Sequence, residues 1–146
     1  CLKSTVVPGT SERFCEEIER ISHLKIGEDF FLAFSPERLA EGAAIKEFKS
    51  FPIVVGSDDP KSNSLAKEFW ESSMGNQVIQ VSSFKAAELT KLADNLWIDL
   101  NIGLANEIAL LSDKLNIDCM EMLIVDKRAC ADFDFTPILL LALEDL

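Results

Sequence analysis

The fold is decided by one stretch, Pro52–Val81, which reads PIVVGSDDPKSNSLAKEFWESSMGNQVIQV. Two apolar runs rich in β-branched residues, Pro52–Gly56 and Gln77–Val81, flank Lys61–Met74, a segment of helical length without glycine or proline. The Asp-Asp-Pro that precedes this segment is typical of a helix start, and Gly75 is typical of a helix end. The stretch therefore predicts strand, helix and strand, the alternation that usually builds a parallel or mixed sheet.

The residues upstream continue this alternation. The β-rich run Leu2–Val7 ends in a Pro-Gly turn, after which Thr10 or Ser11 can cap an amphipathic helix over Glu12–Ile21. The run Phe30–Phe34 is continuously apolar, as expected of a strand that is covered on both faces. We therefore predict an α/β fold with helices on the faces of its sheet.

The sequence pattern changes after residue 82. Residues Phe84–Leu115 contain no proline and one glycine, and leucines recur at helical spacing, which predicts one long helix. At 1.5 Å per residue it would run about 45 Å, longer than a small sheet layer requires. We expect residues 1–82 to form the α/β part, residues 83–125 a helical region with a short second helix at Met120–Val125, and residues 126–146 an atypical tail.

Composition and charge exclude several classes of function. The 146 residues carry a net charge of −11 and contain no basic cluster, so nucleic-acid and anionic-membrane binding are not expected. The longest apolar stretch, Phe135–Leu143, is far shorter than the roughly 20 residues that a membrane-spanning helix needs. Four widely spaced cysteines without a signal-peptide pattern indicate reduced thiols and a cytoplasmic protein. His23 is the sole histidine, and no metal site is expected. The chain opens with Cys1, so we expect a piece of a longer sequence.

Three groups of polar residues could carry chemistry. Ser4–Thr10 (STVVPGT) places hydroxyls at the end of a predicted strand, where α/β sheets bind ligands, although a simple helix cap is the alternative. Ser35–Gly42 (SPERLAEG) offers two carboxylates for general-base work, although a solvated loop fits as well. On the long helix, Glu88, Lys91 and Asn95 lie on one stripe. A lysine beside an amide can hold an oxyanion or a sugar hydroxyl, and a solvated helix face is the alternative.

These three motifs, the last within Ala87–Asn95 (AELTKLADN) and running on to Ala105–Glu107, resemble the UDP-glucose/GDP-mannose dehydrogenase family. The resemblance covers residues 1 to about 125 and is closest to members that act on UDP-N-acetylmannosamine. It implies the carboxyl half of an NAD-binding Rossmann domain, followed by a helical region that forms a homodimer. Family members oxidise the C6 alcohol of a UDP-sugar to a uronic acid for polysaccharide precursors, through an aldehyde and a cysteine thioester.

The resemblance also implies residue roles. Thr5 would place the catalytic water and touch the nicotinamide end of the cofactor, Glu37 would be the base for that water, and Glu41 would lie close to the cofactor. Lys91 would stabilise the oxyanion, and Asn95 would assist it. The substrate site would comprise Glu37, Arg38, Leu39, Ala40, Glu41, Lys91 and Asn95.

Two parts of the family pattern do not occur in this sequence. It contains no glycine-rich dinucleotide fingerprint, and no Gly-Gly-x-Cys-x-x-Lys-Asp run that would carry the nucleophile. Cys130 has Asp134 four residues on, but no glycine pair precedes it and Phe133 replaces the lysine, so we do not expect it to be the nucleophile. We expect an incomplete dehydrogenase that is inactive alone. The alternative is a non-catalytic helical association module.

Overall fold

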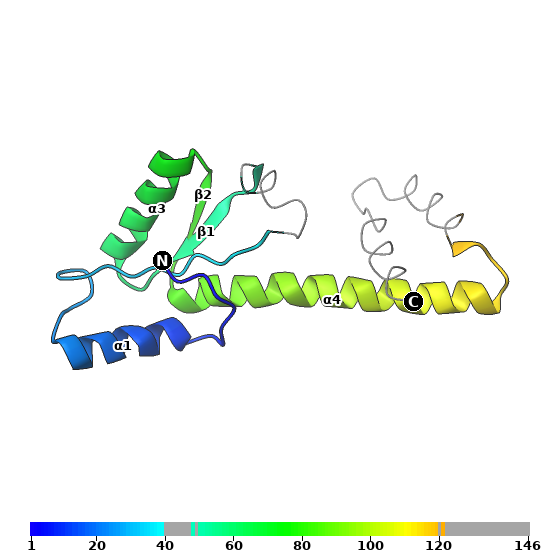
Figure 1. Ribbon diagram of the computed structural model, residues 1–146, viewed down its shortest axis with the longest axis horizontal. Coiled ribbons are helices and arrows are strands. Elements are labelled where there is room, and N and C mark those ends of the chain that lie inside the picture. The colour runs from blue at the N-terminus through cyan, green and yellow to red at the C-terminus, as the bar shows by residue number, and fades with distance from the viewer. Residues whose placement is uncertain (40–47, 49, 120, 122–146) are drawn as a thin grey trace. The chain divides into compact units, whose positions relative to one another are not determined.

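The computed structural model describes residues 1–39, 48, 50–119 and 121 (Figure 1). The chain divides into two compact units, Cys1–Asp94 and Asn95–Leu146. Several predictions fall outside the described residues: those for Ala40, Glu41 and Cys130, and most of the predicted helix Met120–Val125. The elements of the described part are α1 (Thr10–Ser22), β1 (Ile53–Gly56), α3 (Pro60–Met74), β2 (Val78–Val81) and α4 (Phe84–Lys114).

The predicted strand–helix–strand unit is confirmed. β1 and β2 pair in parallel, with Ile53 opposite Val78. Helix α3 connects them, and its first turn begins where the sequence indicates. The Asp59 carboxylate accepts a hydrogen bond from the Ser62 backbone N–H at 2.6 Å, which satisfies one of the free donors of the first turn. The helix ends at Gly75, whose φ of 69° lies in the left-handed region that glycine adopts without strain.

The strands predicted at Leu2–Val7 and Phe30–Phe34 are wrong as continuous strands, because each is reduced to an isolated bridge within the described residues. Leu2 bridges Phe34 in parallel, and Phe34 bridges Gly56 in the antiparallel sense. Proline lacks the N–H that a ladder needs, and Pro8 and Pro36 follow these extended segments closely. Because the Leu2–Phe34 bridge is parallel and the Phe34–Gly56 bridge is antiparallel, the extended segments around Leu2 and Phe34 end at the same edge of the sheet, and β1 ends at the opposite edge.

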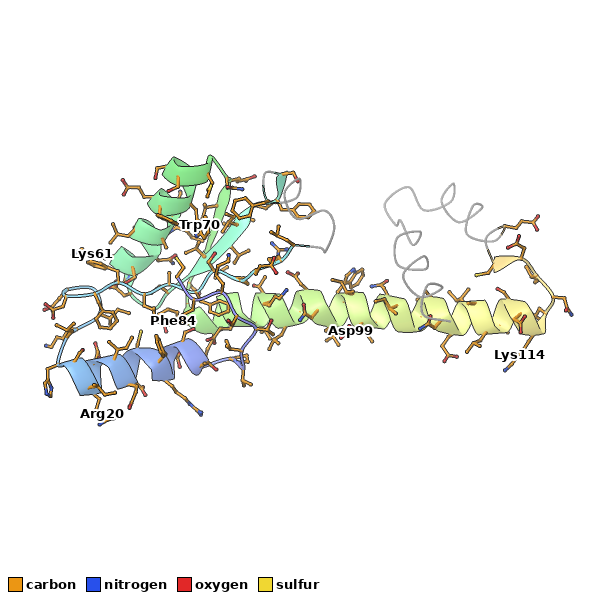
Figure 2. All side chains as sticks on the ribbon, viewed as in Figure 1. Arg20, Lys61, Trp70, Phe84, Asp99 and Lys114 are labelled. Carbon is orange, nitrogen blue, oxygen red and sulfur yellow. The ribbon has the colours of Figure 1, made fainter. Side chains whose placement is uncertain are left out.

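Apolar side chains cover both faces of this small sheet, as the continuous apolar runs predict. Adjacent strand residues point to opposite faces, so Val54 and Val55 enter two different clusters. Phe84 of α4 and Trp70 of α3, labelled in Figure 2, belong to these two clusters. One cluster consists of Cys15, Phe34, Val54, Phe84 and Ala87, and the other of Ala33, Val55, Ala66 and Trp70.

Gly56 marks the closest approach between β1 and the start of α4. A Cβ added there would lie 2.4 Å from the Ser83 carbonyl oxygen and 2.7 Å from the Ala87 Cβ. Only glycine fits this contact without a shift of backbone. The packing fixes the first turns of α4 against the sheet, and these turns carry the polar stripe singled out in the sequence.

The long helix predicted at Phe84–Leu115 is confirmed as α4, which contributes residues to both units. In the second unit, Asn101, Ala105 and Ser112 are buried. Along the same stretch Leu96, Leu100, Leu104 and Leu111 expose about half or more of their surface, with values from 49% to 62%. None of the helices in the described part of the chain has the length and apolar character needed to cross a bilayer.

Candidate functional site

The first two polar motifs lie side by side. The Ser35 N–H donates to the Leu2 carbonyl at 2.8 Å, and the Glu37 N–H donates to the Lys3 carbonyl at 3.4 Å. These bonds continue the pairing of the two extended segments past their bridge, so Glu37 comes beside the segment that leads to Thr5. The side chains of Thr5 and Glu37 are both exposed. They are therefore accessible to a ligand from solvent.

An ion pair connects the second motif to α4. The Arg38 guanidinium donates through Nε to the Asp94 carboxylate, and the two side chains are 32% and 33% exposed. Asp94 lies three residues after Lys91 on the same helix, and residues at this spacing are neighbours on a helix surface. The ion pair therefore holds the Glu37 loop near the turn of α4 that carries Lys91.

Glu88 does not share a site with Lys91 and Asn95 as the stripe suggests. Its side chain is fully buried, with 0% exposure, and its two carboxylate oxygens accept hydrogen bonds from the backbone N–H groups of Gly9 at 2.6 Å and Ser11 at 2.8 Å. The carboxylate thereby caps the N-terminus of α1. The prediction that Thr10 or Ser11 caps this helix is wrong: Gly9 is the N-cap residue, and the Thr10 hydroxyl donates to the Val7 carbonyl at 2.6 Å.

Lys91 lies between two anchor points on α4. Three residues before it, Glu88 binds the turn that follows Thr5, and three residues after it, Asp94 binds Arg38. Lys91 is partly buried, and so is Asn95, the first residue of the second unit. The first unit thus brings the segments of Thr5, Glu37 and Lys91 to one region, while Ala40 and Glu41 lie outside the described residues.

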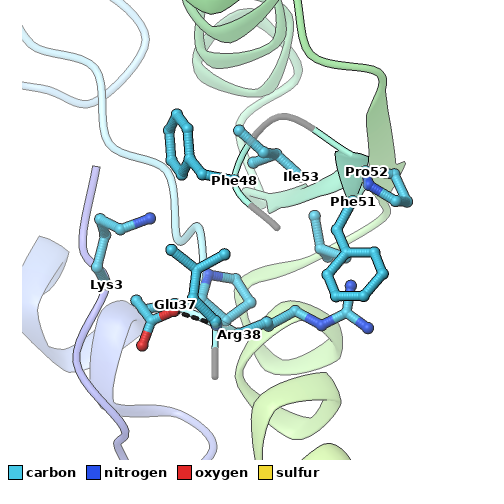
Figure 3. A pocket seen from close by; sticks show the side chains of 10 residues that line it. Lys3, Glu37, Arg38, Phe48, Phe51, Pro52 and Ile53 are labelled. Atoms are coloured by element: carbon cyan, nitrogen blue, oxygen red, sulfur yellow. Dashed lines mark hydrogen bonds between the residues drawn. The ribbon is translucent and has the colours of Figure 1, made fainter. Parts of the chain in front are cut away.

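A small apolar pocket of about 70 Å³ opens beside this region (Figure 3). In this view Lys3 and Glu37 lie on the left with Phe48 above them, and the Phe51 ring lies on the right beside Arg38. The pocket is lined by Lys3, Pro36, Glu37, Arg38, Leu39, Phe48, Phe51, Pro52, Ile53 and Val54.

Lys3 is a residue of this region that the sequence reasoning missed. Burial lowers the pKa of its ammonium group below the ordinary value, and the nearby Glu37 carboxylate raises it in part. The Nζ atom lies 4.9 Å from the centre of the Trp70 ring, within range of a cation–π contact. The signal in the sequence is weak: one basic residue immediately precedes the hydroxyls Ser4 and Thr5.

The N-terminus of α1 does not fit a dinucleotide pyrophosphate. Free N–H groups at a helix start are the usual phosphate site, but here the N–H groups of Gly9 and Ser11 already donate to Glu88. A phosphate at this place would also meet the buried negative charge. Thr5, in contrast, is exposed to solvent.

The cysteines among the described residues differ in exposure: Cys1 is exposed, Cys119 is partly buried and Cys15 is buried. Cys15 is buried, and burial together with Glu19 raises the pKa of its thiol to about 11, so it stays protonated at neutral pH. Cys130 is not among the described residues. The same part of the chain contains no group of three potential metal ligands.

Comparison with protein families gives two matches. Residues 1–74 match a model described as the NAD binding domain of the UDP-glucose/GDP-mannose dehydrogenase family. Residues 85–131 match the central domain of the same family. The two matches follow one another in the order in which the chain passes from the sheet into α4.

Curated relatives include Protein CapL of Staphylococcus aureus, which is 37% identical over 122 residues, covering 83% of this chain and 29% of CapL. UDP-N-acetyl-D-mannosamine dehydrogenase of Pyrococcus horikoshii is 32% identical over 120 residues, covering 82% of this chain and 28% of the relative. This chain therefore spans less than a third of the length of these relatives.

Solved structures agree with the fold. A UDP-D-ManNAc dehydrogenase from Pyrococcus horikoshii superposes with a TM-score of 0.78 at 32% identity, over 84% of this chain and 29% of that one. A ternary complex of GDP-mannose dehydrogenase from Pseudomonas aeruginosa gives a TM-score of 0.77 at 29% identity, over 92% of this chain and 30% of that one. The sheet and helices described above thus have Rossmann-type dehydrogenase neighbours.

Proposed function

Because this chain belongs to the UDP-glucose/GDP-mannose dehydrogenase family, we propose that it is part of an NAD-dependent dehydrogenase that oxidises the C6 alcohol of a UDP-sugar to a uronic acid. One observation carries the proposal: the segments of Thr5, Glu37 and Lys91 lie in one region of the first unit, tied to α4 on both sides of Lys91. The family matches favour this function over a non-catalytic association module.

Each residue has a role that its chemistry allows. The Lys91 ammonium stabilises the negative oxygen that develops on the substrate, and Asn95 assists it by donating a hydrogen bond. In the complete enzyme, where a cysteine forms a thioester with the substrate, the exposed Glu37 carboxylate would accept a proton from the water that hydrolyses this thioester, and the Thr5 hydroxyl would position the water. The backbone from Glu37 to Leu39 would line the sugar, and the family resemblance extends this role to Ala40 and Glu41, which lie outside the described residues.

The cofactor contributes one kind of chemistry. When bound, NAD would accept one hydride in each of the two oxidation steps, so two NAD molecules are consumed for each uronic acid. Thr5 would lie at the nicotinamide end, and Glu41, which lies outside the described residues, is assigned to the cofactor by the family resemblance alone. The start of α1 takes no part in holding its phosphates, because Glu88 occupies that helix end. The pyrophosphate would therefore be held elsewhere than at the start of α1.

Among UDP-sugars, we favour UDP-N-acetylmannosamine, because relatives that carry this substrate in their names recur among the matches. A uronic acid on a nucleotide carrier is a precursor for polysaccharide synthesis. We place the reaction in the cytoplasm, since the chain is acidic and its cysteine pattern is that of reduced thiols.

A chimera tests the function. The part of this chain that aligns with the Pyrococcus horikoshii UDP-N-acetyl-D-mannosamine dehydrogenase replaces its counterpart in that enzyme. We expect NADH formation at 340 nm with UDP-N-acetylmannosamine, with the unmodified enzyme as positive control and UDP-glucose as the competing substrate. A folded chimera that oxidises neither sugar would refute the proposal.

We also propose that the protein forms a homodimer through α4. The leucines at 96, 100, 104 and 111 expose apolar surface at helical spacing, and a second copy of the helix would bury it. We expect a dimer of the 146-residue chain in analytical ultracentrifugation at micromolar concentration. Charged substitutions, Leu100→Glu with Leu104→Glu, should give a monomer. A well-folded chain that is monomeric without these substitutions would contradict the dimer.

A further inference from the structure

The buried Glu88 carboxylate does more than cap α1, because it connects two segments that are far apart in the sequence. Its two bonds reach Gly9 and Ser11 across separations of 79 and 77 residues. Removing a carboxylate from water is costly unless strong hydrogen bonds replace the lost hydration. Both oxygens accept such charge-assisted bonds. Because the two bonds need Glu88 and the turn before α1 in one relative position, they stabilise that position over others.

A local cap was available and is not used. Thr10 and Ser11 are both residue types that cap helices with their own hydroxyls. The Thr10 hydroxyl instead donates to Val7, and the Ser11 hydroxyl is buried without a hydrogen-bond partner within the described part of the chain. The start of α1 is therefore held by a residue of another helix, and this fixes where the turn lies as well as how the helix begins.

The span that carries Thr5 is consequently held at both ends. At its start, Leu2 exchanges hydrogen bonds with Ala33 and Ser35 at 2.9 and 2.8 Å. At its end, the Thr10 N–H donates to the Val7 carbonyl at 3.1 Å, which closes the turn, and Gly9 is bonded to Glu88. Between these points Thr5 is exposed, so its place depends on the two ends.

Other contacts at the turn are weaker. Lys85 pairs with Glu12 at 2.6 Å, but these side chains are 57% and 32% exposed, and exposed pairs contribute little. Gly9 itself has a φ of 94°, a backbone conformation that glycine adopts readily and that presents its N–H to the carboxylate. Glu88 is thus the principal connection between this turn and α4.

We propose that Glu88 is a positioning residue, which fixes the Thr5 segment next to the turn of α4 that carries Lys91. The inference rests on the proposed function for its catalytic meaning, because Thr5 and Lys91 are assigned there. Glu88 touches neither substrate nor cofactor, and it acts through the Pro8–Ser11 turn.

The first test measures backbone order in the 146-residue chain by ¹⁵N relaxation. Glu88→Gln keeps the size of the side chain but replaces one acceptor by an NH₂ group that faces an N–H donor. We expect higher mobility at Ser4–Val7 and unchanged order in β1. The matched control is Glu68→Gln, a change at an exposed glutamate on α3. Mobility that rises only within Gly9–Arg13 would show a helix cap alone and overturn the proposal.

The second test measures kinetics in the chimera. We expect Glu88→Gln to lower kcat at least tenfold with KM within twofold, and Glu88→Asp, which keeps the charge, to recover part of the loss. If kcat is unchanged while Lys91→Ala lowers it, the positioning role is overturned.

If the chimera is inactive without substitutions, the proposed function fails, and the relaxation experiment still decides whether Glu88 orders the Thr5 segment. Should Glu88→Gln fail to fold, Glu88→Asp takes its place in both tests with the same criteria.

Discussion

Replacing Lys91 by alanine in the chimera is expected to lower turnover by roughly 10²–10³, or about 2.7–4 kcal/mol of transition-state stabilisation. The reason is that Lys91 is held in place by its own helix, between the residues that bind the Thr5 and Glu37 segments. A preorganised cation acts mainly on the charge that develops during the reaction, so the effect on KM should be smaller.

Steady-state kinetics with UDP-N-acetylmannosamine measure this effect. Lys114→Ala, at the far end of α4 where the side chain is exposed, serves as the control and should leave turnover unchanged. If Lys91 is only a solvated residue of the helix surface, its removal should change stability by less than about 0.5 kcal/mol and turnover hardly at all. Near-normal turnover would remove Lys91 from the site and weaken the assignment of Asn95.

The largest effect on stability is expected at Phe34. Its side chain is fully buried, with 0% exposure, in the cluster that includes Cys15 and Phe84. Phe34→Ala removes a ring and leaves a cavity between elements that are already joined through the backbone bonds of Phe34 and Gly56. Such substitutions typically cost about 3–5 kcal/mol.

Urea unfolding of the 146-residue chain, followed by circular dichroism, measures this loss as a shift of the midpoint. The matched control is Phe14→Ala on α1, where the residue is 46% exposed, and its cost should be about 1–1.5 kcal/mol. Equal losses for the two variants would mean that the cluster around Phe34 does not carry the stability of the first unit.

The sequence predicted those parts of the fold whose causes are local. Helix α3 starts at an Asp-Pro pair and ends at a glycine, and both signals act within one turn of the residues that they affect. The start of α1 could not be predicted in the same way, because its cap comes from Glu88, 77 residues from Ser11. The antiparallel bridge of Phe34 to Gly56 was equally hidden, since an apolar run does not indicate the direction of its partner.

For the site, residue types and spacing singled out the stretches Ser4–Thr10 and Ser35–Gly42 and the helix stripe that carries Lys91. The family resemblance then pointed to Thr5 and Glu37, and the structure brings the three segments together. Their roles stay predictions until the variants are measured. The sequence could not separate Glu88 from Lys91, because helical spacing tells which residues are neighbours and not which of them a second element will cover. Lys3 was missed because its significance arises from burial beside Trp70, a contact between residues far apart in the chain.

The long reach of the Glu88 bonds also bears on the order in which the chain folds. β1, α3 and β2 are consecutive, so they can assemble after closing a short loop, whereas joining Gly9 to Glu88 closes a loop of 79 residues and loses more chain entropy. We therefore expect the strand–helix–strand unit to form early and the Thr5 segment to gain its place late. By the same reasoning this segment is among the first to be released in local unfolding, which makes its order a sensitive indicator of how intact the first unit is.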